Sequence, residues 1–280
     1  MPDTSAAPDA SAAAAAIRLD HVTLKRGDRV VLTDFSLAIP TGKVTAVMGP
    51  SGCGKTTVLK LITGQLRPDK GQVWVGDTEV NKLRGADLNH LRRDIGVLLQ
   101  NGALFTDLTC FDNVALPLRE HTKLPEPLIR RLVLLKLQTV GLRGAAGMYP
   151  RELSGGMNRR VAMARAMALD PRVMVYDEPF AGLDPISLGA SVRLIREINR
   201  ALAITSVVIT HDVAEVPKFA DFCCIIADGR VVASGTPDQL HQSDQDVVRQ
   251  FMKGLPDGPV PFHFPAPPIA DDLLAVGVRR

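Results

Sequence analysis

The fold of this 280-residue chain is decided by the stretch Gly49-Pro50-Ser51-Gly52-Cys53-Gly54-Lys55-Thr56-Thr57. It follows a run from Lys43 to Met48 that reads as a buried strand, and it precedes a helical pattern at residues 58–62. The spacing matches G-x-x-x-x-G-K-[ST] in the strand–loop–helix setting that a phosphate-binding loop requires. We therefore expect this loop to bind nucleotide phosphates, with Lys55 reaching the β- and γ-phosphates and the Thr56 hydroxyl as a ligand of Mg²⁺.

The glycines of this loop explain why it suits phosphate. Without a Cβ in the way, backbone N–H groups converge on phosphate oxygens, and the following helix adds its positive N-terminal end. A chance glycine-rich turn gives the same pattern in on the order of one chain per hundred of this size. The strand before the loop and the helix after it make chance a much weaker explanation.

A second chemical element is the apolar run Val173-Met174-Val175-Tyr176, which ends in the two carboxylates Asp177 and Glu178. At the end of the strand, Asp177 is expected to hold Mg²⁺, directly or through water. Glu178 points elsewhere and is expected to polarise an attacking water. An exposed Asp-Glu pair at a strand end is common, but beside a phosphate loop it indicates phosphoryl chemistry.

A third element is Leu153-Ser154-Gly155-Gly156-Met157, which precedes a helix rich in Ala and Met. It offers a second helix N-terminus with bare backbone N–H groups, and hence a second anion site. An ordinary helix start with Ser154 as its N-cap has the same sequence. Two phosphate-binding helix ends are difficult to use on one nucleotide unless two chains meet.

The order of the remaining segments predicts an α/β protein. Strands alternate with helices after the phosphate loop, which indicates a mostly parallel, doubly wound core. The early strands have no helices between them and suggest an antiparallel subdomain. We expect strands at 17–24, 29–33, 36–39, 71–75, 95–99, 173–176, 206–210, 223–226 and 231–233, and helices at 58–63, 114–141 with interruptions at prolines, 160–168 and 188–202.

Composition sets broad limits. Hydrophobic residues make up 46% and charged residues 22%, and a net charge of +3 is too small to indicate nucleic acid as a partner. The four cysteines have no metal-ligand spacing, so we expect free thiols. No apolar stretch reaches about 18 residues, so we expect no membrane span. Residues 1–16 read as a disordered tail, 17–254 as the folded domain and 255–280 as a proline-rich extension.

This combination of motifs resembles the ATP-binding cassette (ABC) ATPase family. The family order is matched by the phosphate loop, by Gln100 at the Q-loop, by residues 153–157 at the signature and by the acidic strand. The D-loop (residues 181–184) and His211 complete the match. The resemblance implies a P-loop NTPase core with an N-terminal antiparallel β subdomain and an α-helical subdomain that carries the signature.

The same resemblance implies a role for each matched residue. Gln100 would sense Mg²⁺ and the membrane subunit, Glu178 would be the catalytic base, and His211 would be the γ-phosphate switch. In this family two cassettes enclose two ATP molecules. That arrangement gives the second helix end its use, because Ser154, Gly155 and Gly156 would contact the ATP that the other protomer holds.

A closer resemblance is to the ATPase subunit of Mla-type phospholipid transporters, which work with mammalian-cell-entry (MCE) proteins. It rests on Asn101–Asp107, Asp112–Val114, Pro117–His121, Gly141–Ala146 and Asp257–Phe262. Ordinary variation within another cassette transporter would be the alternative. The resemblance implies a homodimer, an integral membrane permease subunit, an MCE protein and a STAS-like protein as partners. It also implies a peripheral position on the cytoplasmic face of the inner membrane.

Two departures from the general cassette pattern bear on the site. Many cassettes carry an aromatic residue that stacks on adenine, and here that place, just before Gly27, is Arg26. A guanidinium plane can stack on a base, although a solvated turn residue is an equally good explanation. The signature ends in Met157 where glutamine is common, which leaves its backbone anion site unaffected.

The leading interpretation is the ATPase of a lipid transporter. A soluble cassette ATPase acting on nucleic acid or ribosomes is the runner-up, but such proteins usually carry two cassettes or a long coiled coil. A non-hydrolysing binding subunit is the third, and the intact Lys55, Asp177, Glu178 and His211 oppose it. In the extension, Phe262 and Phe264 argue against a disordered linker, because both would otherwise be exposed. The Mla-type resemblance implies an extended strap packed on the partner cassette.

Overall fold

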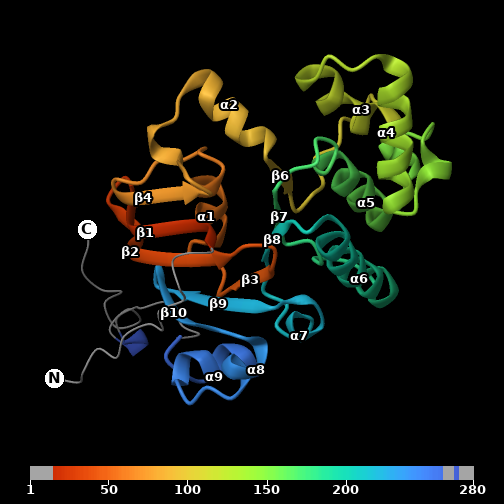
Figure 1. The fold of residues 1–280 in the computed structure, drawn as a ribbon. Coiled ribbons are helices and arrows are strands. Elements are labelled where there is room, and N and C mark those ends of the chain that lie inside the picture. The colour runs from red at the N-terminus through yellow and green to blue at the C-terminus, as the bar shows by residue number, and fades with distance from the viewer. Residues whose placement is uncertain (1–14, 261–267, 271–280) are drawn as a thin grey trace, which may run out of the picture.

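The computed structural model describes residues 15–260 and 268–270. One sheet is antiparallel, with its strands in the order β2-β1-β4-β5, and is coloured red to orange in Figure 1. Its strands are β1 (Ala15–Arg26), β2 (Arg29–Pro40), β4 (Lys70–Val75) and β5 (Thr78–Glu79). This sheet is the predicted antiparallel subdomain, and its buried face, which includes Ile17, Leu19 and Phe35, packs into the core around the first helix.

A second sheet of six strands, in the order β10-β9-β3-β8-β7-β6, forms the centre of the molecule. The pairs β3·β8, β3·β9, β6·β7 and β7·β8 are parallel, and only β10 runs antiparallel to its neighbour β9. The strands are β3 (Val44–Met48), β6 (Ile95–Leu98), β7 (Val173–Asp177), β8 (Thr205–Ile209), β9 (Phe222–Ala227) and β10 (Arg230–Gly235).

Both faces of the parallel strands are buried, as their continuous apolar sequences require. Val173 and Val175 of β7 belong to the cluster around the first helix and the antiparallel sheet, whereas Met174 and Tyr176 belong to the cluster under the other helices. The period of two along the strand therefore divides one apolar run between two cores.

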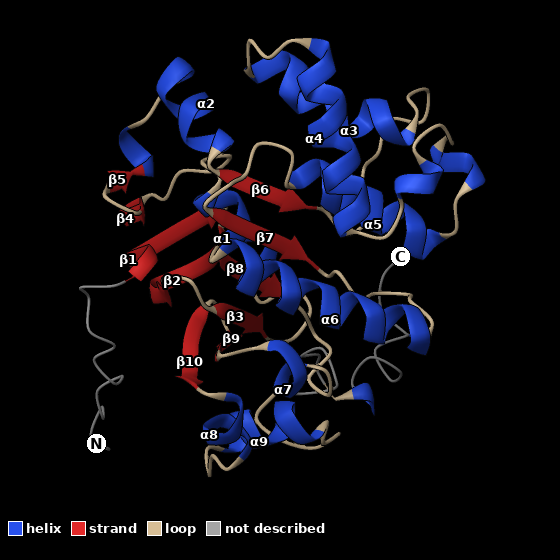
Figure 2. Cartoon of the chain, turned by 45° about the vertical axis from the view of Figure 1, so that its right-hand side comes forward, coloured by secondary structure: helices blue, strands red, loops and turns tan. Residues whose placement is uncertain are grey.

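The helices form two groups around this sheet. Helices α3 (Cys110–His121), α4 (Glu126–Thr139) and α5 (Gly155–Ala166) gather in a lobe at the upper right of Figure 1. Figure 2 shows α6 (Pro185–Leu202) lying beside strands β7 and β8. The remaining helices are α1 (Lys55–Ile62), α2 (Gly85–Arg93), α7 (Val216–Phe219), α8 (Pro237–His241) and α9 (Asp246–Lys253).

The structure confirms the predicted fold class and changes several element boundaries. The two early strands predicted at 29–33 and 36–39 are one strand, β2, which continues through an irregularity at Asp34 with φ of 49°. Strand β1 begins at Ala15, inside the predicted tail. Pro117 lies within α3 and does not interrupt it. Phe262 and Phe264, on which the strap prediction rests, lie outside the described residues.

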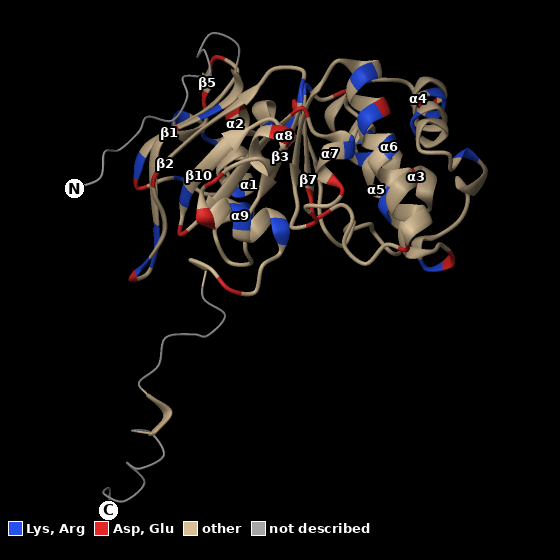
Figure 3. Cartoon of the chain, turned by 90° about the horizontal axis from the view of Figure 1, so that it is seen from below, with Lys and Arg blue, Asp and Glu red and all other residues tan. Residues whose placement is uncertain are grey.

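Basic and acidic residues occur in both halves of the described part of the molecule. Figure 3 shows Lys and Arg interspersed with Asp and Glu in both the strand-rich half and the helical lobe. The pattern agrees with the small net charge of +3. Within residues 15–260 and 268–270, no helix combines the length and the apolarity that crossing a membrane requires.

Candidate active site

Three parallel strands bring the phosphate loop, the Asp177-Glu178 pair and His211 to one edge of the central sheet. In the register of the sheet, Ile209 of β8 lies opposite both Val47 of β3 and Asp177 of β7. The phosphate loop, Glu178 and His211 follow the ends of these three strands directly. In open α/β sheets, the carboxyl ends of the strands are where ligands bind.

Two glycines allow the phosphate loop to pass close to its neighbours. A Cβ on Gly49 would lie 2.2 Å from the carbonyl oxygen of Ile226, so no other residue fits there without moving the backbone of β9. Gly54 caps α1 in the left-handed region, with φ of 111° and no side-chain cap. The first N–H groups of α1 are consequently left available to an anion.

Lys55 is folded back into the loop that it serves. Its side chain is buried, and Nζ donates to the carbonyl oxygens of Gly49 at 2.6 Å and Pro50 at 2.9 Å. These two bonds hold the cationic group inside the loop, where phosphate oxygens can replace the carbonyls as acceptors. Neighbouring Cys53 is a free thiol whose pKa is raised, chiefly by burial.

Glu178 and His211 form a pair. Glu178 Oε2 lies 2.9 Å from His211 Nδ1, and the carboxylate side chain is only 16% exposed while the imidazole is 64% exposed. The backbone of Glu178 adopts φ of 47°, uncommon for a residue with a side chain, and its N–H donates to Ile209 O at 2.9 Å. The chain thus turns sharply after β7, which directs Glu178 toward the end of β8 and away from Asp177.

Asp177 and Thr56 have the chemistry that Mg²⁺ prefers. The carboxyl of Asp177 is half-buried at the end of β7, and its pKa is raised, first by burial and then by Glu178, while Lys55 opposes the shift. Thr56 is exposed at the start of α1. Within the described part of the chain no three Asp, Glu, His or Cys residues form a metal cluster. A hydroxyl with one carboxylate suits Mg²⁺, which usually completes its shell with water and substrate phosphates.

Arg26 ends β1 beside the phosphate loop, where it could reach a bound nucleotide. It lines a cavity of about 270 Å³ together with residues 52 and 54–57. Arg29, its partner in the register of the β1–β2 hairpin, lines the same cavity. Sequence reasoning missed Arg29, although the two-residue turn between the arginines was a signal that they lie opposite each other.

Gln100 is exposed just after β6, and its backbone is connected to the acidic strand by an arginine that sequence reasoning also missed. Arg159 of α5 donates to Gln100 O at 3.0 Å, to Pro179 O at 3.0 Å and to Ala181 O at 2.8 Å. Its pKa is lowered by burial. The guanidinium therefore joins the helical lobe to the segments that follow β6 and β7, and no local pattern around Arg159 marks it out.

The signature segment begins α5, as expected both for a second anion site and for an ordinary helix start with Ser154 as its N-cap. Ser154 is the N-cap, and its hydroxyl accepts a hydrogen bond from Met157 N at 3.2 Å. Gly155 is exposed and opens the helix. Ser154, Gly155 and Gly156 do not line the cavities beside the phosphate loop, so the structure does not bring this helix end to the nucleotide site of its own chain.

Comparison with known proteins places these features in a family. Residues 32–181 match the family model described as ABC transporter. A relative from Haemophilus influenzae, named as the intermembrane phospholipid transport system ATP-binding protein MlaF, is 53% identical over 258 residues, which cover 92% of this chain and 98% of the relative.

Two solved structures share the fold. The first is titled as the dimeric structure of a post-hydrolysis state of the ATP-binding cassette MJ0796 bound to ADP and Pi. It has a TM-score of 0.72 and 31% identity, and it covers 79% of this chain and 98% of its own. The second is cbiO1 from Clostridium perfringens, described as part of the ABC transporter complex cbiONQ. It has a TM-score of 0.77 and 29% identity, and it covers 87% of this chain and 96% of its own.

Proposed function

This chain belongs to the ABC transporter family, and from that premise we propose that it is the ATP-hydrolysing subunit of a transporter that moves phospholipid between membranes. One observation carries the chemical part of the proposal. The parallel register of β3, β8 and β7 brings the phosphate loop, His211 and the carboxylates to one edge of the sheet. The name of the 53% identical relative supports the choice of phospholipid.

In this proposal each residue acts on the nucleotide from a fixed position. The loop N–H groups and Lys55 bind the phosphates, with Nζ exchanging its bonds to Gly49 O and Pro50 O for phosphate oxygens. Glu178 accepts a proton from the attacking water, and the contact with His211 Nδ1 orients its carboxylate. Thr56 and Asp177, with Gln100, would hold Mg²⁺, which when bound offsets the negative charge of the phosphates.

The second helix end gives the proposal its partner copy. Ser154, Gly155 and Gly156 lie at the start of α5 and do not line the nucleotide cavity of their own chain. We assign them to the ATP held by a second copy. Closure of two copies around two nucleotides then makes hydrolysis depend on dimerisation.

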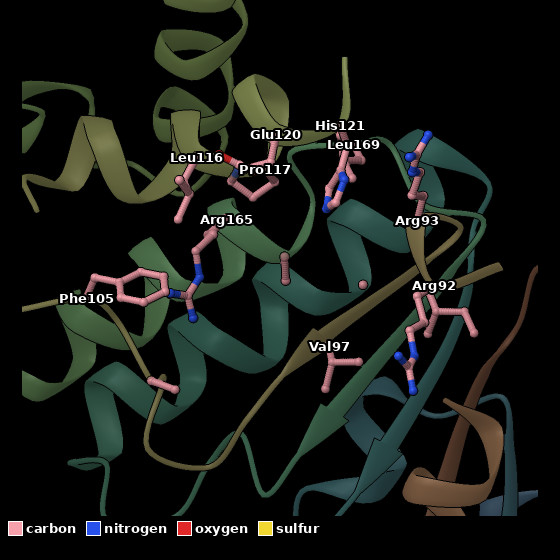
Figure 4. Close-up of a pocket in the computed structure, with 14 residues that line it drawn as sticks. Arg92, Arg93, Val97, Phe105, Leu116, Pro117, Glu120, His121, Arg165 and Leu169 are labelled. Atoms are coloured by element: carbon pink, nitrogen blue, oxygen red, sulfur yellow. The ribbon is translucent and has the colours of Figure 1, made fainter. Parts of the chain in front are cut away.

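A cavity of about 420 Å³ between β6, α3 and α5 is the docking place that we propose for the membrane permease subunit. It is lined by Ala103 and Phe105, which follow Gln100, and Phe105 is 53% exposed. Figure 4 shows Phe105 and Arg165 directed toward each other, with Arg92 and Arg93 at the opposite side. An amphipathic segment with an apolar side chain for Phe105 and a carboxylate for Arg92 and Arg93 fits this lining.

The remaining partners follow from the likeness to the phospholipid transport relative. We propose that an MCE protein and a STAS-like protein complete the complex, and that this subunit sits on the cytoplasmic face of the inner membrane, held there by the permease. ATP and Mg²⁺ are its nucleotide and metal. No nucleic acid is required.

The test of the catalytic assignment compares Glu178→Gln with Lys55→Ala in the assembled transporter. Glu178→Gln is expected to keep ATP affinity and to lower turnover by roughly 10²-fold or more, the scale of a lost general base. Lys55→Ala is expected to weaken ATP binding itself, because Nζ no longer reaches the phosphates. Steady-state hydrolysis and calorimetric ATP titration separate the two effects.

Glu197→Gln is the matched control for this test. This variant makes the same change of carboxylate to amide at an exposed position of α6, where Glu197 forms an ion pair with Arg193. Its turnover should equal that of the unmodified protein. Near-normal turnover of Glu178→Gln would reject the catalytic assignment, and unchanged ATP affinity of Lys55→Ala would reject the phosphate-loop assignment.

A further inference from the structure

The first turn of the C-terminal extension folds back onto helix α9. The chain reverses at Gly254, which has φ of 61° and ψ of 37°, and Leu255 N then donates to the carbonyl oxygen of Gln250 at 2.9 Å. Only a residue that tolerates the left-handed region makes this reversal without strain. The extension therefore begins by turning back against helix α9 of the same chain.

The side chain of Gln250 continues this contact further along the extension. Its Nε2 donates to Val260 O at 2.9 Å, and its Oε1 accepts from Val260 N at 2.8 Å. Gln250 is only 7% exposed. A buried amide needs partners for its donor and its acceptor, and the backbone of Val260 supplies both in the manner of a neighbouring strand.

Gly258 permits the close approach that these bonds require. A Cβ at this position would lie 2.5 Å from Gln250 Cδ and 2.6 Å from Gln250 Oε1. Because the amide of Gln250 is held at both ends by Val260, it cannot move aside without losing those bonds. Glycine is thus the residue that lets the extension pass over Gln250.

Val260 connects this contact to the candidate active site. It is half-buried and lines a cavity of about 380 Å³ whose other walls are residues 29–31, 50–53 and 227–229. Residues 50–53 are the first half of the phosphate loop, and residues 29–31 continue from the hairpin that carries Arg26. A residue of the extension is therefore a wall of the space beside the phosphate loop.

We propose that Gln250 is a positioning residue for nucleotide binding: it fixes Val260 as a wall of the phosphate-loop cavity, so that ATP affinity depends on the start of the extension. The proposal rests on the assignment of ATP to this loop. Loss of the wall opens the cavity to water and releases the loop on one side, whereas a bulkier wall narrows the cavity. Both changes weaken binding without touching Glu178 or His211.

The test uses the full chain and two variants. Gln250→Glu loses the donor to Val260 O and places a carboxylate against that oxygen. Val260→Trp keeps both backbone bonds and fills part of the cavity. We expect Gln250→Glu to raise the calorimetric Kd for Mg-ATP by roughly three- to tenfold, the scale of one net hydrogen bond, and Val260→Trp to raise it because the larger side chain occupies part of the cavity. In hydrolysis assays KM should rise while kcat at saturating ATP stays within about twofold.

Matched controls introduce the same residues, Glu and Trp, at positions away from the cavity. Gln245→Glu changes an exposed glutamine at the start of α9, and Leu255→Trp enlarges an exposed residue of the extension, 41% exposed. Both controls should bind Mg-ATP as the unmodified chain does. A matching rise in Kd in the controls would overturn the proposal.

The remaining outcomes also decide the question. If Gln250→Glu leaves the Kd for Mg-ATP unchanged, the pair of hydrogen bonds between Gln250 and Val260 (the clamp) does not act on the site. If Val260→Trp leaves it unchanged, Val260 does not limit the space that the nucleotide occupies. Either result overturns the proposal. A lower kcat with an unchanged KM in either variant would also overturn the proposal, because it indicates a general structural effect. Lys55→Ala, run beside them, separates this from the proposed function: if it binds ATP normally, the assignment of ATP to the loop fails first.

Discussion

At the scale of single residues, Arg26 stands where many cassettes carry an aromatic residue, and Arg29 lies opposite it. Arg26 and Arg29 lie opposite each other at the end of the β1–β2 hairpin, and both line the cavity beside the phosphate loop. A guanidinium stacks on any π-face and adds charge toward the phosphates. The site is therefore expected to favour triphosphates without selecting strongly among bases.

Nucleotide choice tests this arrangement. We expect the unmodified protein to bind ATP and GTP with similar affinity, and Arg26→Ala to lose roughly 1–3 kcal/mol of binding to both, the scale of one stacked base. Calorimetric titration of each nucleotide measures the effect. If Arg26→Ala binds both as well as the unmodified chain, Arg26 is a solvated residue of the turn.

Much of the site was predictable from short patterns, because a phosphate loop and an acidic strand end carry their chemistry within a few residues. The contact between Glu178 and His211 was not, since it depends on β7 and β8 being neighbours in the sheet. Arg159 escaped detection for a similar reason. Its three backbone acceptors come from two separate loops, which only the folded chain brings together.

At the scale of elements, tertiary packing overrode local propensity in α3. Pro117 costs about 3 kcal/mol inside a helix, but α3 buries Val114, Ala115 and Leu118. Fully buried Asn113 anchors the helix by donating to three carbonyl oxygens of residues 105–109. Helix α8 was not predicted, although its capping box is a signal that the sequence contains. Helix α2 was not predicted either, because it has one buried residue and hence little hydrophobic periodicity.

Asp221 makes a testable connection between elements. Its Oδ2 accepts from Val44 N at 2.9 Å and its Oδ1 from Arg196 Nη1 at 2.7 Å, which ties the segment between α7 and β9 to β3 and α6. Burial opposes the charge, but these two donors outweigh it and hold the pKa of this carboxyl below its usual range. Asp221→Asn should therefore lower the free energy of unfolding by about 1–3 kcal/mol at neutral pH.

The pH dependence of that effect has a defined sign. A carboxyl whose pKa is lowered by folding stabilises the protein above its unfolded pKa, about 3.9, and the contribution is lost as pH falls through the lower folded pKa. Denaturant unfolding of the unmodified chain and Asp221→Asn, at neutral pH and in acid, should show curves that converge in acid. A difference that persists unchanged in acid would contradict the role of the charge.

At the scale of the whole molecule, the start of the extension is integrated with the cassette. Gln250 binds the backbone of Val260 through both ends of its amide. The proline content of residues 255–280 is typical of a linker, and the Mla-type resemblance implied a strap. Neither indicated the contact between Gln250 and Val260, because the partner of Gln250 is a backbone group and has no side-chain signal.

Two truncations separate the clamp from the rest of the extension. Ending the chain after Gly254 leaves the buried amide of Gln250 without partners, which should lower the free energy of unfolding by about 1–3 kcal/mol while the cassette still folds. Ending it after Val260 should restore that stability. We expect both truncations to weaken dimerisation, because both lack Phe262 and Phe264. Dimerisation of either truncated protein at full-length strength would show that the extension is no strap.

Phospholipid transfer by the assembled transporter tests the central claim most directly. With the permease and its other subunits in vesicles, a fluorescent phospholipid should move between membranes only when Mg-ATP is supplied. Glu178→Gln should lower transfer by roughly 10²-fold or more, in step with hydrolysis, and Glu197→Gln should leave it unchanged. Transfer that continues without ATP, or at the normal rate in Glu178→Gln, would contradict the account.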